Sequence, residues 1–205
     1  TLPVKQTKVL SIAFSHDGNF LAVANNNHTI TIWSARHGVE VKTLQGHNET
    51  ITKIAFSADN KILASASADH TIMIWNFAEG QLLQTIKDHT KEVSGLAFTP
   101  DGKLLASGGF DGIVYFWNTL SWKLEKKISP GTGRIRSLAI SPDNKFVALG
   151  TEKKGTLLFE IFTGYLYKTL SDQKDITNDL QFSADGKYLF TGAFDFGVKV
   201  FEVEK

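Results

Sequence analysis

The chain of 205 residues contains no cysteine, which excludes both a disulfide framework and a thiolate metal site. The redox compartment is therefore undetermined. No stretch approaches the ~18 apolar residues that a membrane-spanning helix needs. No secretory signal is visible, although Thr1 is not a natural start and a leader could have been removed. The formal net charge of +1 gives no electrostatic reason to expect nucleic acid or an anionic membrane as a partner.

A helical period is also missing, and a fixed long repeat takes its place. A thirteen-residue pattern returns every 42 residues without insertion or deletion. Its five copies are LAVANNNHTITIW (21–33), LASASADHTIMIW (63–75), LASGGFDGIVYFW (105–117), VALGTEKKGTLLF (147–159) and LFTGAFDFGVKVF (189–201). Self-similarity at this period indicates a repeat architecture, with units at about 3–44, 45–86, 87–128, 129–170 and 171–205.

Each unit shows four short alternating segments separated by turn residues, as at 50–57, 62–66, 71–75 and 81–86. In the first segment, at 9–15, we expect Val9, Ile12 and Phe14 to point inward. Four short antiparallel strands in about 40 residues are typical of a propeller blade. We therefore predict an all-β propeller, occupying 1–205 as a single domain or fragment, whose last repeat lacks its outer strand.

The second and third units carry the most specific motifs. The second has Gly46-His47, FSADN at 56–60 and Trp75-Asn76, and the third has FTPDG at 98–102 and Trp117-Asn118. With five copies in strict register, the chain resembles the WD-repeat family of β-propellers over essentially its whole length.

The resemblance implies a hydrogen-bonded set of His, Ser or Thr, Asp and Trp within a blade. Two units hold all four residue types, at His47, Ser65, Asp69 and Trp75, and at His89, Ser107, Asp111 and Trp117. In these sets Ser would accept a hydrogen bond from the buried indole nitrogen.

The other three units depart from the pattern. The corresponding residues are Lys5, Val23, Asn27 and Trp33 in the first unit, Gly131, Leu149, Lys153 and Phe159 in the fourth, and Gln173, Thr191, Asp195 and Phe201 in the fifth. Phe159 and Phe201 need no hydrogen-bond acceptor, so we expect packing alone to hold the last two blades.

Neither catalysis nor metal binding is expected from these residues. A Ser-His-Asp triad needs an exposed nucleophile, whereas these serines lie in mid-strand and the set occurs twice. The six histidines have no metal-ligand spacing such as H-x-x-x-H. We therefore predict no catalytic, cofactor-binding or metal site, and no cofactor.

Five residues are candidates for partner binding. Phe110 and Phe194 occupy equivalent turns, and an exposed aromatic there could anchor a partner or fold onto its own turn. Arg134 and Arg136 should lie near the same face, either as a binding surface or as a solvated one. Trp122 replaces a turn glycine on the opposite face, where it either meets another domain or packs over its turn.

The resemblance implies a non-catalytic scaffold that binds a protein or peptide on the propeller face. One alternative is a sensor or regulatory module of a larger multidomain enzyme, and a propeller hydrolase is a distant third. We expect a cytoplasmic protein, although the sequence does not determine the compartment. Because the fifth unit stops after three strands, we also expect further blades of the parent polypeptide, or a second chain, to complete the ring.

Overall fold

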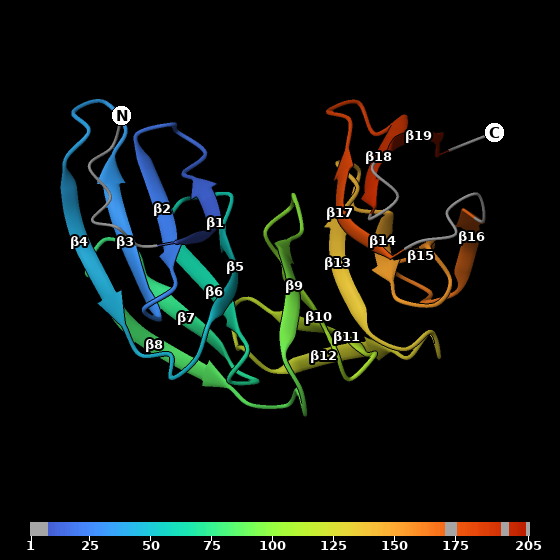
Figure 1. Cartoon of the computed structure of the whole chain (residues 1–205), viewed down its shortest axis with the longest axis horizontal. Helices are drawn as coiled ribbons and strands as arrows, with labels where there is room; N and C mark the ends of the chain where they lie inside the picture. The colour runs from blue at the N-terminus through green and yellow to red at the C-terminus, as the bar shows by residue number, and fades with distance from the viewer. Residues whose placement is uncertain (1–7, 171–175, 194–196, 204–205) are drawn as a thin grey trace. The chain divides into compact units, whose positions relative to one another are not determined.

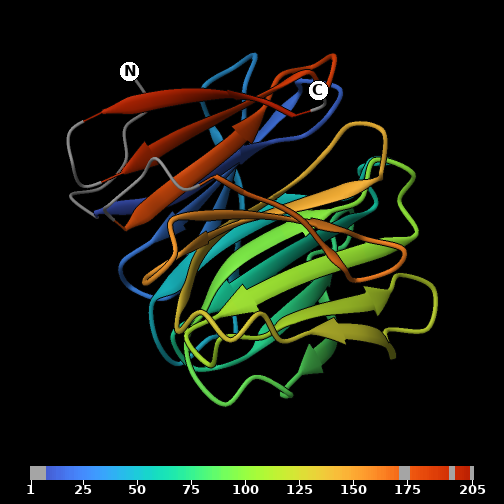
Figure 2. The ribbon, with the colours of Figure 1, turned by 90° about the vertical axis from the view of Figure 1, so that its right-hand side faces the viewer.

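The computed structural model describes residues 8–170, 176–193 and 197–203, and this part of the chain consists of strands joined by short turns (Figures 1 and 2). The expected all-β fold is confirmed. The chain divides into two compact units, Thr1–Val93 and Ser94–Lys205. None of the described residues forms a helix long and apolar enough to cross a lipid bilayer.

The first unit holds two four-stranded sheets, or blades, whose strands are antiparallel and follow one another in sequence order. The first blade comprises β1 (Val9–Phe14), β2 (Phe20–Asn25), β3 (Thr29–Ser34) and β4 (Glu40–Gln45). The second comprises β5 (Ile51–Phe56), β6 (Ile62–Ser67), β7 (Ile72–Asn76) and β8 (Gln81–Ile86). The strands lie within two residues of their expected positions because turn residues bound each alternating segment.

The second unit continues the pattern, with β9 beginning at the boundary. Its third blade comprises β9 (Val93–Phe98), β10 (Leu104–Gly109), β11 (Val114–Asn118) and β12 (Leu124–Ile128). The fourth comprises β13 (Ile135–Ile140), β14 (Phe146–Thr151), β15 (Thr156–Glu160) and β16 (Leu166–Leu170). The last sheet, β17 (Thr177–Phe182), β18 (Tyr188–Ala193) and β19 (Val198–Glu202), has three strands within the described residues.

The core of each unit lies between consecutive blades. In the first unit, Ile30 and Ile32 of β3 pack in one cluster with Ile54 and Phe56 of β5. In the second unit, residues at the same places in the repeat form the corresponding clusters: Val114 and Phe116 with Leu138, and Leu158 with Leu180 and Phe182. The third strand of one blade therefore covers the inner strand of the next, and burial of these apolar faces stabilises the stack.

The expectation that Val9, Ile12 and Phe14 point into the core is wrong. All three are exposed, with Ile12 and Phe14 each 58% accessible, whereas Ile54 and Phe56, 42 residues later, are each 4% accessible. Ile54 and Phe56 are covered by the first blade. Within the first unit no earlier blade is present to cover the same positions of β1. Alternation identified the apolar face correctly but could not show whether a neighbour covers it.

Candidate functional site

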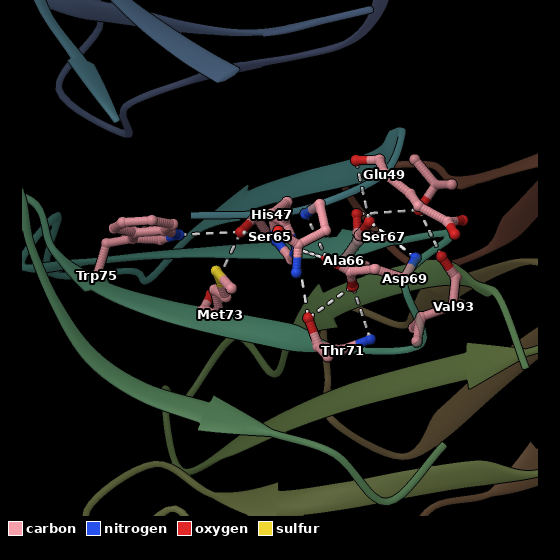
Figure 3. Close-up of polar contacts among 12 residues, drawn as sticks. His47, Glu49, Ser65, Ala66, Ser67, Asp69, Thr71, Met73, Trp75 and Val93 are labelled. Atoms are coloured by element: carbon pink, nitrogen blue, oxygen red, sulfur yellow. Dashed lines mark hydrogen bonds and ion pairs between the residues drawn. The ribbon is translucent and has the colours of Figure 1, made fainter. Parts of the chain in front are cut away.

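The second blade contains a continuous chain of hydrogen bonds that runs from the turn before its inner strand to its third strand (Figure 3). Nδ1 of His47 lies 2.8 Å from Oδ2 of Asp69, and Nε2 lies 2.8 Å from Oγ of Ser65. The Trp75 indole nitrogen donates to the same Ser65 oxygen at 2.9 Å. Since a carboxylate only accepts, Nδ1 of His47 is the donor to Asp69. This chain ties the turn before β5 to β6 and β7.

Asp69 is the acceptor at the end of this chain. Besides His47, it accepts from the Asn48 amide at 3.0 Å and from the amide and hydroxyl of Thr71 at 3.0 and 2.6 Å. Burial raises the pKa of Asp69, but the hydrogen bonds from His47 and Thr71 lower it more, so that its pKa lies below the ordinary value. The sequence did not single out Thr71, although a hydroxyl two residues after a turn Asp is a known local hydrogen-bonding pattern.

The third blade repeats part of this arrangement within the second unit. The Trp117 indole nitrogen donates to Oγ of Ser107 at 3.0 Å, and Asp111 accepts from the Ile113 amide at 3.2 Å. His89 is buried and belongs to the first unit. In both blades the serine at this position accepts from the tryptophan.

The blades without the complete set show what its loss does. In the first blade Val23 occupies the serine position, and the buried indole nitrogen of Trp33 has no hydrogen-bond partner among the described residues. In the fourth blade Leu149 is buried and faces no such donor, because Phe159 replaces the tryptophan. Lys5, Gln173 and Asp195 lie outside the described residues.

The second unit brings three of the candidate binding residues together. Phe110 follows β10, while Arg134 and Arg136 flank the start of β13. The Cζ atoms of Arg134 and Arg136 lie 5.0 and 4.8 Å from the centroid of the Phe110 ring. The Phe110 ring is half-buried rather than fully exposed. It therefore neither projects freely nor folds onto its own turn alone, and both arginines of the next blade contact it.

The two turns that carry these residues are in close contact. Gly112 has φ of 78°, and a Cβ atom there would lie 2.7 Å from the carbonyl oxygen of Gly133. Any larger residue at Gly112 would therefore force the turns apart. Nε of Arg134 lies 4.0 Å from the carboxylate of Glu152.

The other two candidates lie elsewhere. Trp122 is half-buried in the turn between β11 and β12, at the opposite end of β11 from Phe110. It adopts φ of 54°, at a position where the other turns have Gly38, Gly80 and Gly164. Phe194 lies outside the described residues.

The family model described as IFT122 first beta-propeller matches residues 8–204. The chain belongs to this family. Its membership confirms the resemblance to WD-repeat propellers. No curated protein matches the chain. For the described residues of this IFT122-type chain, no group of three or more His, Cys, Asp or Glu side chains is placed to hold a metal ion.

Sequence reasoning missed a turn that all five blades of this IFT122-type chain share. A Ser or Thr hydroxyl donates to the Asp two residues later, at Ser15–Asp17, Ser57–Asp59, Thr99–Asp101, Ser141–Asp143 and Ser183–Asp185. In each turn the same hydroxyl also accepts the amide five residues on, as Ser141 accepts that of Phe146 at 2.8 Å. Burial raises the pKa of Asp101 and Asp143, but in all five turns the hydrogen bonds hold the pKa of the carboxyl below its ordinary value. The repeated S/T-x-D pattern was the available signal.

Proposed function

We propose that this chain is a non-catalytic interaction scaffold that docks a protein or peptide at Phe110, Arg134 and Arg136. One observation carries the proposal. The half-buried guanidinium of Arg136 lies over the Phe110 ring, and no acceptor for its Nε atom occurs among the described residues. Aromatic residues and arginine supply many of the side chains that contribute most to binding energy at protein interfaces. The family supports the scaffold role, and a cytoplasmic location rests on the WD-repeat resemblance alone.

The test is to measure which residues of this chain are protected from hydrogen exchange by the partner that copurifies with the parent protein. We expect binding to slow hydrogen exchange in the turns at 109–112 and 131–136, and Phe110→Ala to weaken binding. Alanine is tolerable at this position because the second blade has Ala68 there. A partner whose footprint spared Phe110, Arg134 and Arg136 would count against the proposal.

We also propose that further blades or a second chain complete the propeller. Val200 on β19 is 54% accessible, whereas Leu158, at the same position of the fourth blade, is 1% accessible. Val198 is 74% accessible, although its counterparts in the other blades are buried. An uncovered apolar face next to a strand edge favours contact with another polypeptide.

A further inference from the structure

Arg136 stands where the second and third blades have a small hydroxyl residue. Thr52 and Ser94 occupy the same position of the 42-residue repeat, at the second residue of the inner strand. The Thr52 hydroxyl donates to the carbonyl of Val93, and the Ser94 hydroxyl donates to that of Ile135 at 2.5 Å. Each hydroxyl thus links two successive inner strands. In the fourth blade this link is replaced by a guanidinium directed at Phe110.

The replacement leaves a charge incompletely balanced. Arg136 is half-buried, and within the described residues it makes neither a hydrogen bond nor an ion pair; its guanidinium contacts the Phe110 ring. Arg134 contacts the same ring, so two like charges lie close to one aromatic side chain. A partly desolvated guanidinium is stabilised when a carboxylate accepts from its fork of N–H groups.

Two carboxylates lie near Phe110 and its arginines, and neither accepts a hydrogen bond from Arg136. Glu152 lies beside Arg134, with its oxygen 4.0 Å from Nε, and Asp111 accepts from the Ile113 amide of its own turn. The Lys153 side chain lies beside the turn at Gly133, since a Cβ atom on Gly133 would be 3.5 Å from it. Lys153 therefore adds a further positive charge next to Arg134. The cluster of Phe110, Arg134, Arg136 and Lys153, here called the basic cluster, therefore carries three positive charges, against the two negative charges of Glu152 and Asp111 beside it.

We propose that the basic cluster binds an acidic peptide segment, with an Asp or Glu carboxylate accepting from Arg136. The inference rests on the proposed function, since it names the chemistry of the partner that this surface would dock. A carboxylate fits better than a phosphate because Glu152 already lies at the edge of the cluster. A dianion would be repelled by Glu152 more strongly than a single carboxylate.

The repeat itself supplies the variants that test this. Arg136→Ser removes the guanidinium and installs the hydroxyl that Ser94 has at this position, so the blade should keep its stability. Lys127→Ser removes one positive charge from an exposed position on β12 and is the matched control. The probe is a fluorescent decapeptide of Glu and Ala, compared with a Gln and Ala version and a phosphoserine and Ala version.

The affinity of the full chain for each peptide is measured by fluorescence anisotropy at low salt. We expect the Glu peptide to bind, the Gln peptide to bind roughly tenfold more weakly, and Arg136→Ser to lose roughly tenfold in affinity. Lys127→Ser should change the affinity less than about twofold. Added salt should weaken binding because the interaction is between opposite charges.

Several outcomes would overturn the inference: no binding of the Glu peptide, equal losses for Arg136→Ser and Lys127→Ser, or tighter binding of the phosphoserine peptide. If Arg136→Ser does not fold, Arg134→Gln replaces it, since the Arg134 side chain is 49% exposed. A natural partner that contacts Phe110 through a segment without carboxylates would overturn this inference and leave the proposed function intact. A natural partner whose footprint avoids the basic cluster would overturn both this inference and the proposed docking site.

Discussion

The side chain at the Ser65 position decides whether the tryptophan of a blade has a hydrogen-bond acceptor. Ser65 and Ser107 accept from Trp75 and Trp117, whereas Val23 leaves the Trp33 indole nitrogen buried without a partner among the described residues. A buried donor without an acceptor keeps its full desolvation cost. The unpaired Trp33 indole nitrogen therefore lowers the stability of the first blade.

This defect predicts a stabilising substitution. Val23→Thr keeps the shape of the buried side chain and places a hydroxyl within reach of Trp33. Threonine is compatible with this position, because the fifth blade has Thr191 there. We expect the free energy of unfolding to rise by about 0.5–1.5 kcal/mol in urea titration. The matched control is Leu149→Thr, which meets Phe159 instead of an indole and should lower it by roughly 1–3 kcal/mol. Effects of the same sign would contradict the argument.

Asp69 gives a second residue-scale prediction. Asp69→Ala removes the acceptor of His47, Asn48 and Thr71, and should lower the free energy of unfolding by about 1–3 kcal/mol. Lys153→Ala, at the same position of the fourth blade, should change it by less than about 0.5 kcal/mol because Lys153 is exposed.

The pH dependence of the Asp69 variant follows from its lowered pKa. A carboxyl whose pKa is lower in the folded state contributes stability above its unfolded value of 3.8, and loses it as the pH falls towards the folded value. The difference in unfolding free energy between the wild-type chain and Asp69→Ala should therefore shrink below about pH 4. A difference that grew in acid would disprove the assigned role.

Consecutive blades are also joined by lysines on their outer strands. Nζ of Lys42 donates to the carbonyls of Phe77 and Ala78 at 2.9 and 2.7 Å. Nζ of Lys126 donates to those of Ile161 and Phe162, in the latter case at 2.9 Å. Each lysine thus satisfies carbonyls in the turn that follows the third strand of the next blade. Burial lowers the pKa of Lys126.

The lysine contact predicts a difference between neighbouring positions on β12. Lys126→Met keeps the apolar stem but leaves two carbonyls without their donor, so the free energy of unfolding should fall by about 1–2 kcal/mol. Lys127→Met, at an exposed position of the same strand, should have an effect below about 0.5 kcal/mol. Thermal unfolding of both variants makes the comparison, and equal shifts would show that the carbonyl contacts contribute nothing.

The elements differ in how far the sequence could predict them. The strands followed from alternation and turn residues, which are local, and their bounds were correct within two residues. The contacts of Lys126 with Phe162 and of Arg136 with Phe110 join residues 36 and 26 positions apart, on different blades. The 42-residue repeat shows which residues are equivalent, but it does not show where a long side chain is directed. The hydroxyl–Asp turns were within reach, because their pattern is local and occurs five times.

At the scale of the whole molecule, the two terminal blades differ from the rest. Ile12 and Phe14 of β1 are exposed where later blades bury their counterparts, and so are Val198 and Val200 of β19. The first pair belongs to the inner strand, which an earlier blade would cover. The second pair belongs to the third strand, which a later blade would cover. Each unit thus has an exposed apolar face that is suited to a blade-like neighbour.

The final prediction concerns the exposed face of β19. Val200→Lys should alter the free energy of unfolding of the 205-residue chain by less than about 0.5 kcal/mol, because the valine is already in contact with water. Leu158→Lys, at the same position of the fourth blade, should cost about 3 kcal/mol or more, since it buries a charge without a partner. We also expect the chain to associate as its concentration rises, and Val200→Lys to reduce that association in sedimentation experiments. A strictly monomeric chain in which Val198 and Val200 are shielded, and β19 is paired along both edges, would show that these 205 residues need no further polypeptide.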